Sequence, residues 1–314
     1  MRQERIIFMG TPDFAVPVLE KLYRAHDVSA VFTAPSSKAG RSQKLKHTPV
    51  HECAVDLGIP LYHPTSLKTD EVASVIQHLN PEVIVVAAYG LFIPSNILEY
   101  PRLGCWNIHP SLLPKLRGAS PVVTSILNRD ATTGVSVIRL DANMDSGPIL
   151  SQRSYQVDFT ETAHSLSMDL FNLGASILIE TLQTAEERGS VLLFEQTHSD
   201  ATYTTKQSKQ DGLINWSSTS LEIEAQIRAF TPWPGSYTHW NTKTLKILQA
   251  ASSSDTSNVL GPIGSVITDP DRNMKIVTSS GLLQVNILQL EGKKSMTTTQ
   301  FLLGYPQIIG SQLS

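Results

Sequence analysis

The feature that most constrains this fold is the alternation of short apolar runs with helical segments through the first half of the chain. Apolar runs that end at turn residues, such as 5–10, 28–33 and 82–90, predict buried strands. Segments with helical periodicity, such as 70–79, lie between them. Because continuously apolar strands are typical of parallel sheets covered on both faces, we expect an α/β domain with a Rossmann-like, mostly parallel sheet.

The composition changes near residue 185, where a polar stretch with little helical periodicity begins. Beyond it, short strand-like pieces are separated by Gly, Asp-Pro and Ser turns, which predicts a small, OB-like β-barrel or curled sheet. The expected organisation is an α/β domain over residues 1–188, a linker over 189–207 and a smaller β-barrel domain over 208–314.

Charge and cysteine content disfavour several kinds of protein. The net charge of −3 gives the chain no overall affinity for nucleic acid, so basic regions have to be judged locally. No apolar run reaches the roughly 18 residues of a membrane helix, and the charged start lacks a secretory signal, so the protein is expected in the cytoplasm. Cys53 and Cys105 form no metal-type pair, so we expect neither a metal site nor a disulfide framework, and Cys105 to be a packed thiol.

Gly10, at a strand-to-helix turn, raises the possibility of a nucleotide-binding enzyme. No G-x-G-x-x-G follows it, however, and no G-x-x-x-x-G-K-[ST] occurs in the chain. Sites for NAD and ATP are therefore disfavoured.

Asn107, His109 and Asp145 form a candidate catalytic set. Asn107 and His109 are two residues apart in the predicted strand 104–109, so their side chains point to the same side. Asp145 lies in a turn-rich loop after another strand, and ligands of parallel sheets bind beyond strand ends. An isolated histidine here would be structural. Ser111 lacks the G-x-S-x-G context of a nucleophile, which favours direct transfer between two substrates.

Several segments resemble the methionyl-tRNA formyltransferases, in the same order along nearly the whole chain. They are RIIFMGTPDFAVPVLEKL, AYGLFIP, GCWNIHPSLLPKLRGASP, TGVSVIRLDANMDSGPIL, INW, RAFTPWPG and GKKSM. NIHPSLLP and MDSGP are similar to the catalytic signature of all formyltetrahydrofolate-dependent transferases, which specifies the chemistry better than the acceptor. GTPDFAVP, AGR, RAFTPWPG and the barrel-like C-terminal half favour the tRNA member.

The resemblance implies an enzyme that transfers the formyl group of 10-formyltetrahydrofolate, its co-substrate, to the α-amino group of methionyl initiator tRNA, for translation initiation. It implies that Asn107 and His109 donate hydrogen bonds to the formyl oxygen, and that Asp145 keeps the imidazole charged and oriented. It also implies a catalytic N-terminal domain and a tRNA-binding C-terminal domain. We expect the enzyme to act as a monomer.

The folate needs an apolar slot for its flat pterin and backbone groups that bind the pterin edge. By resemblance, three segments supply both, although some of their apolar side chains could equally be core. The residues are Tyr89, Gly90, Leu91, Phe92, Ile93, Ser111, Leu112, Leu113, Pro114, Asp141, Ala142, Asn143 and Met144.

Residues 33–50 are basic and contain no acid, in a connection longer than the usual length of about 2–6 residues. A solvated loop would also explain the charge, but the family uses a basic loop here to engage the acceptor end of tRNA. The expected tRNA-binding residues of this loop and of the C-terminal domain are Lys38, Arg41, Lys44, Lys46, Lys206, Lys209, Lys293 and Lys294.

Two alternatives stay open. The first is a formyltransferase for an amino-sugar nucleotide, which would share the fold, the folate and the catalytic set. The second is a non-catalytic RNA-binding relative, which the intact set disfavours. Pro110 stands where tRNA members often have a small residue, and HPSLLP is closer to purine-pathway transferases, which affects the acceptor rather than the chemistry.

Overall fold

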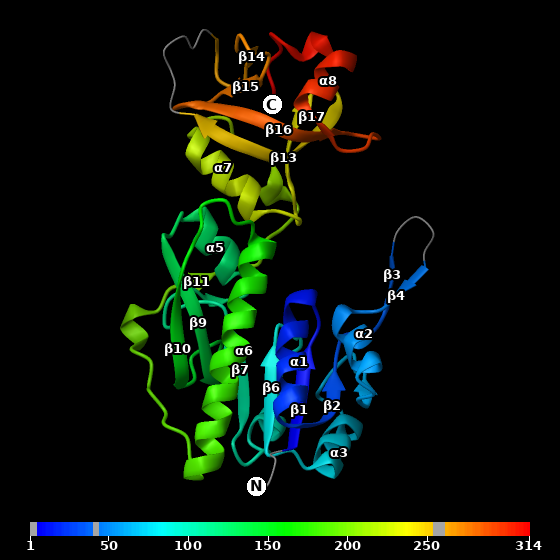
Figure 1. The fold of residues 1–314 in the computed structure, drawn as a ribbon, viewed down its shortest axis with the longest axis vertical. Helices are drawn as coiled ribbons and strands as arrows, with labels where there is room; N and C mark the ends of the chain where they lie inside the picture. The colour runs from blue at the N-terminus through cyan, green and yellow to red at the C-terminus, as the bar shows by residue number, and fades with distance from the viewer. Residues whose placement is uncertain (1–4, 40–43, 254–260) are drawn as a thin grey trace. The chain divides into compact units, whose positions relative to one another are not determined.

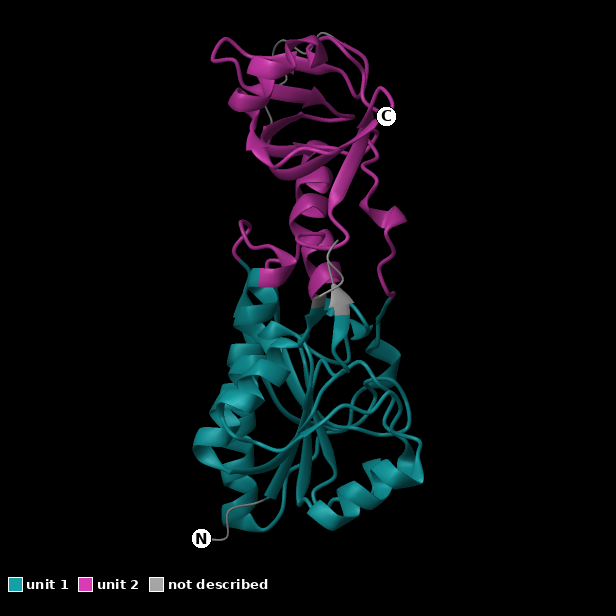
Figure 2. Ribbon diagram, turned by 90° about the vertical axis from the view of Figure 1, so that its right-hand side faces the viewer, with its two compact units in different colours: residues 1–121, 132–157, 165–204 teal, residues 122–131, 158–164, 205–314 magenta. Residues whose placement is uncertain are grey.

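The structure is a computed structural model that describes residues 5–39, 44–253 and 261–314. The chain divides into two compact units, which Figure 2 colours separately. Unit 1 comprises residues 1–121, 132–157 and 165–204, and unit 2 comprises residues 122–131, 158–164 and 205–314. The domain limits predicted at 188 and 208 stay a prediction.

Unit 1 is built on a seven-stranded sheet in the order β10-β9-β7-β6-β1-β2-β5 (Figure 1). The strands are β1 (Arg5–Gly10), β2 (Asp27–Phe32), β5 (Leu61–Tyr62), β6 (Val83–Ala87), β7 (Cys105–His109), β9 (Thr132–Arg139) and β10 (Ile149–Gln156). Neighbours from β5 to β7 pair in parallel, while β9 is antiparallel to both β7 and β10. The predicted mostly parallel sheet is therefore confirmed, with one reversed strand.

Helices cover both faces of this sheet. The helices are α1 (Val16–Ala25), α2 (Pro49–Asp56), α3 (Asp70–Leu79), α4 (Ser95–Leu98) and α6 (Ala163–Arg188). Buried residues of α1, α2 and α6 share one core with Trp106 and Ile108, whereas α3 and α4 share a second core with Cys105. Within the described residues, no helix has both the length and the apolar character needed to cross a membrane.

The connection predicted as a polar loop contains a β-hairpin. In it, β3 (Ser37–Ala39) pairs antiparallel with β4 (Lys44–Lys46). The strand β4 has only three residues, and its one apolar residue, Leu45, is 62% exposed. So short a strand has no apolar alternation that would identify it in the sequence.

Unit 2 contains a curled antiparallel sheet in the order β12-β13-β16-β15-β14, with β17 paired to β16. Its elements are α5 (Pro121–Leu127), which starts in unit 1, α7 (Ser220–Ala229), β12 (Ser236–Trp240), β13 (Lys243–Ser253), β14 (Val266–Thr268), β15 (Met274–Val277), β16 (Leu282–Leu290), β17 (Met296–Thr297) and α8 (Thr298–Gly304). Trp240, Leu245 and Phe301 pack in its core. The predicted curled sheet is confirmed, and a capping box formed by Thr297 and Gln300 starts α8.

Candidate active site

Strand β7 places Asn107 and His109 on one side of the unit 1 sheet. Trp106 and Ile108 pack in the core beneath α1 and α6, so the alternating residues face the core that holds Cys105. His109 is 4% exposed. Asn107 is half-buried, and its carboxamide makes no hydrogen bond to any described residue. The amide is therefore free to donate to a ligand.

Both ring nitrogens of His109 face an acceptor. Nε2 lies 3.0 Å from the carbonyl oxygen of Leu116, and because a carbonyl can only accept, Nε2 carries a hydrogen. Nδ1 lies 3.6 Å from Oδ2 of Asp145, which is close enough for an ion pair but too long for a hydrogen bond. Nδ1 is thus near a carboxylate and still available to a third group.

Asp145 is held by backbone groups. Its Oδ2 accepts a hydrogen bond of 2.8 Å from the backbone N–H of Gly118, and its own backbone has a φ of 50°. Asp141 stabilises the same loop by accepting from the Ser146 hydroxyl at 2.9 and 2.8 Å. At Gly147 a Cβ would collide with the Arg139 carbonyl, so only glycine allows the loop to pass so close to the end of β9.

The position of Asp145 differs from the expectation that it lies beyond a strand end at the same edge as His109. Because β9 is antiparallel to β7, the end of β9 lies beside the start of β7, where Leu140 N donates to Cys105 O at 2.7 Å. Residues 141–145 therefore double back to bring the carboxylate to the far end of β7. The strand-end rule accounts for His109 but not for Asp145.

Arg117 and Gln196 form a buried clamp on this loop that sequence reasoning missed. Arg117, 2% exposed, donates from Nε and Nη2 to Gln196 Oε1 at 3.1 and 2.7 Å. Gln196 Nε2 in turn donates to the carbonyl oxygens of Asp145 and Gly147 at 2.8 and 2.7 Å. The neighbouring backbone is fixed by the parallel pairing of β8 (Arg117–Gly118) with β11 (Tyr203–Thr204). The clamp thus sets the path of the backbone that carries the carboxylate.

The side chain and backbone of Ser111 are hydrogen-bonded within and next to the loop that follows β7. The residue is fully buried, its hydroxyl donates to the Lys115 carbonyl at 2.7 Å, and its carbonyl accepts from the Ser136 hydroxyl at 2.6 Å. Leu113 is tied to the same Ser136 hydroxyl through its N–H, at 3.1 Å. These contacts agree with the prediction that Ser111 is not a nucleophile.

The thiol of Cys105 is also unsuited to attack. It is buried, its Sγ lies 3.6 Å from the Ile97 carbonyl, and burial raises its pKa to about 12. The prediction of a packed thiol is confirmed.

The residues assigned to the folate are partly core and partly exposed. The buried or half-buried ones are Tyr89, Leu91, Ile93, Ser111, Leu112, Leu113, Pro114 and Asp141, and the exposed ones are Gly90, Phe92, Ala142, Asn143 and Met144. Burial raises the pKa of Tyr89 well above its usual range, and its hydroxyl has no hydrogen-bond partner among the described residues. Phe92 and Met144, at 62% and 65% exposure, are apolar surfaces open to a ligand.

The structure describes only part of the predicted tRNA-binding set. Arg41 lies outside the described residues, as do the side chains of Lys38 and Lys44. The described members are all exposed: Lys46, Lys206, Lys209, Lys293 and Lys294.

Comparison with known proteins identifies both units. The formyl transferase family model matches residues 4–182, and the model for the C-terminal domain of formyl transferases matches residues 206–306. The methionyl-tRNA formyltransferase of Rickettsia bellii (strain RML369-C) is 39% identical over 302 residues, which are 96% of this chain and 97% of that protein.

Two solved structures share the fold. A variant of HypX from Aquifex aeolicus has a TM-score of 0.68 and 15% identity over 99% of this chain, which spans about half (49%) of HypX. WlaRD, a sugar 3N-formyl transferase, has a TM-score of 0.64 and 21% identity, with 94% of this chain and 100% of that one covered. The chain therefore belongs to the formyl transferase family, and its similarity to methionyl-tRNA formyltransferases runs through both of the family's domains.

Proposed function

We propose that this protein transfers a formyl group from 10-formyltetrahydrofolate to the α-amino group of methionyl initiator tRNA. The observation that carries the chemistry is the meeting of His109 Nδ1 and Asp145 Oδ2 at 3.6 Å, on the same side of β7 as the free carboxamide of Asn107. The acceptor is supported by the 39% identity to methionyl-tRNA formyltransferases over nearly the full chain. The sugar formyltransferase similarity, at 21% identity, supports the fold alone.

Several side chains assigned to the folate suit the formyl donor. The exposed Phe92 and Met144 offer apolar contacts for a flat ring, and the unpartnered Tyr89 hydroxyl is a polar group that a ligand or water can satisfy. Residues 89–93, 111–114 and 141–144 would hold the folate, which would supply an electrophilic formyl carbon to the reaction.

The residues of the chain then act on the formyl oxygen and on the protons. Asn107 Nδ2 and His109 Nδ1 donate hydrogen bonds to the oxygen, where negative charge develops as the amine attacks. Asp145, kept in place by Gly118 N–H at 2.8 Å, stabilises the positive charge on the imidazole. The new C–N bond forms to the amine, which loses a proton, while the old C–N bond breaks and the folate nitrogen gains one. Asp145 assists this proton movement, directly or through water.

A formylation assay tests the proposal. The purified protein is given 10-formyltetrahydrofolate with methionyl initiator tRNA, methionyl elongator tRNA or an amino-sugar nucleotide, and the formylated product is measured. We expect formylation of the initiator tRNA. Formylation of the amino-sugar nucleotide alone would overturn the acceptor, and tRNA binding without any turnover would identify a non-catalytic relative.

A further inference from the structure

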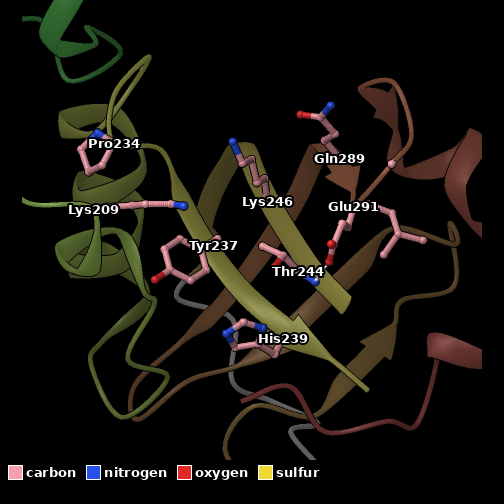
Figure 3. A pocket seen from close by; sticks show the side chains of 10 residues that line it. Lys209, Pro234, Tyr237, His239, Thr244, Lys246, Gln289 and Glu291 are labelled. Atoms are coloured by element: carbon pink, nitrogen blue, oxygen red, sulfur yellow. Dashed lines mark hydrogen bonds between the residues drawn. The ribbon is translucent and has the colours of Figure 1, made fainter. Parts of the chain in front are cut away.

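Unit 2 contains a pocket of about 530 Å³ that lies on its sheet, and none of the residues proposed to be catalytic lines it (Figure 3). Its volume falls in the range of about 300–1,000 Å³ in which proteins bind small ligands. Its lining comprises Lys209, Pro234, Tyr237, His239, Thr244, Lys246, Gln289, Leu290, Glu291 and Gly292. Aromatic and cationic side chains thus share one cavity with a single carboxylate.

The floor of the pocket consists of two rows of cross-strand neighbours. In the first row, Tyr237 of β12 pairs with Lys246 of β13, which pairs with Gln289 of β16. In the second row, His239 pairs with Thr244, whose backbone N–H donates to Glu291 Oε2 at 3.0 Å. Leu245 and Ile247, which alternate with the lining residues of β13, pack in the unit 2 core instead. The pocket therefore occupies the sheet face opposite to that core.

Tyr237 and His239 form an aromatic corner. Their ring centroids are 5.8 Å apart and their planes meet at 78°, so a flat ring packed on one of them meets the edge of the other. Tyr237 is held in place, because its carbonyl accepts from Ile214 N–H at 2.8 Å and the backbone of Gly212 packs against its ring. The corner is half-buried and is formed before any ligand arrives.

Positive charge borders this corner. Lys209 and Lys246 line the pocket, while Glu291 is its only acid among the lining residues. Gln289 Nε2 donates to the Lys293 carbonyl at 2.8 Å, which ties the turn that carries Lys293 and Lys294 to the rim. Figure 3 shows Lys209 and Tyr237 on one side of the cavity and Gln289 and Glu291 on the other, with Lys246 between them.

We propose that this pocket binds one unpaired nucleotide of an RNA, with the base against Tyr237 and His239 and the phosphates near Lys209 and Lys246. Base stacking on aromatic side chains beside cations that contact the backbone is how proteins hold single-stranded nucleic acid. The Glu291 carboxylate provides an acceptor for an amino group of the base. The choice of RNA over a free nucleotide rests on the proposed function. It gives a role to Lys209, which lines the cavity.

The test measures binding of a labelled six-nucleotide single-stranded RNA by fluorescence anisotropy at about 50 mM salt, where phosphate contacts are strong. Tyr237→Leu keeps an apolar side chain against Gly212 but removes the aromatic face. It should weaken binding about 5- to 150-fold, which corresponds to about 1–3 kcal/mol, while Tyr237→Phe should bind like the wild type. Unchanged binding by Tyr237→Leu would overturn the proposal.

Lys246→Gln and Lys243→Gln form a matched pair on β13. Only Lys246 lines the pocket, although both side chains are exposed. Lys246→Gln should weaken RNA binding about 2- to 5-fold and lower the magnitude of the log–log salt slope by about 0.7. Lys243→Gln should change neither. An equal effect of the two changes would mean that general charge, rather than the pocket, attracts the RNA.

Two further arms separate the possible ligands. Duplex RNA of the same length should compete poorly, because its bases are already stacked and paired, and equal competition would contradict an unpaired nucleotide. AMP or UMP that binds as tightly as the six-nucleotide RNA would make this a free-nucleotide site and overturn the assignment to RNA. If the wild type formylates tRNA but Tyr237→Leu binds RNA as well as the wild type does, this inference fails and the proposed function stands. If Tyr237→Leu weakens RNA binding but the wild type formylates nothing, only the proposed function fails.

Discussion

The two sheets present their polar side chains in different ways. In unit 1, His109 is buried and its surroundings are held by Gly118, Arg117 and Gln196. In unit 2, Tyr237 and Lys246 stand on a sheet face and are held mainly by strand pairing. A constrained, buried set suits chemistry that needs fixed distances, whereas an open face suits binding. Substitutions should therefore change the rate in unit 1 and the affinity in unit 2.

The largest effect on stability should come from a substitution that unfolds unit 2 and leaves unit 1 folded. Phe301 of α8 is fully buried and its ring stacks on Tyr305 with centroids 4.9 Å apart. Phe301→Ala should lower the free energy of unfolding of unit 2 by about 3–5 kcal/mol, since it leaves a cavity. Calorimetry should show only the unit 2 transition shifting, and 10-formyltetrahydrofolate binding should persist.

The control for this change is Leu303→Ala, in the same helix, whose side chain is 83% exposed and whose loss should have little effect on stability. A single transition that shifts as a whole in Phe301→Ala would mean that the two units unfold together. The catalytic residues of unit 1 and the pocket of unit 2 could then not be treated as independent of each other.

The second largest effect should be on the rate of formylation, through the catalytic set of unit 1. His109→Ala removes a donor from the formyl oxygen and should lower kcat/KM by about 10²- to 10³-fold, or about 2.7–4 kcal/mol of barrier. Steady-state formylation kinetics provide the measurement, with folate and tRNA binding nearly unchanged. His78→Ala, an exposed histidine at the end of α3, should keep full activity. Retained activity in His109→Ala would remove the basis for the catalytic set.

A third substitution tests whether Gln196 affects catalysis by positioning the Asp145 backbone. Gln196→Glu keeps an acceptor for Arg117 but loses the two donations to the carbonyl oxygens of Asp145 and Gly147. It should lower kcat by about 10-fold or more, because small displacements of a reacting group are costly, while KM for tRNA stays the same. A change in KM with an unaltered kcat would show that Gln196 has no positioning role.

The sequence predicts features that depend on local periodicity. Continuous apolar runs identified the buried strands β1 and β6, and the alternation in β7 placed Asn107 and His109 on one side. Nothing local indicated that β9 runs in reverse, so the route of the Asp145 loop could not be foreseen. The Arg117–Gln196 contact joins residues 79 positions apart, and Gln196 falls in a polar stretch predicted to be a linker. Long-range pairing of this kind leaves no periodic pattern.

The pocket in unit 2 was missed for a related reason. The strand β12, which carries Tyr237 and His239, follows two prolines and is only five residues long, with no continuous apolar run. Of the lysines expected to contact tRNA, Lys209 lines this pocket, and Tyr237, Lys246 and Gln289 lie side by side in it through the register of three strands. Composition alone cannot supply that register.

The smallest expected effect is a difference between the two units in how acid lowers their stability. In unit 1, burial lowers the pKa of His26 below its ordinary value of 6.5, and the Glu186 carboxylate, with Oε1 3.2 Å away, offsets this only in part. Burial also lowers the pKa values of His51 and His63. In unit 2, hydrogen bonds from the Asn273 side chain and backbone lower the pKa of Asp269 to about 2. The two units should therefore lose stability in different pH ranges.

The signs follow from proton uptake on unfolding. Below about pH 6.5 the unfolded chain protonates histidines that stay neutral in the folded unit 1, so stability present above that pH is lost on acidification. Asp269 stays charged in folded unit 2, so its contribution is present above about 3.8 and is lost only as pH falls toward 2. Calorimetry from pH 7 to 5 should move the unit 1 transition first. His26→Leu should flatten that shift, whereas Asp269→Asn should lower the transition of unit 2 above about pH 4 and remove the acid-induced loss below it. A shift of unit 2 before unit 1 between pH 7 and 5 would contradict the comparison.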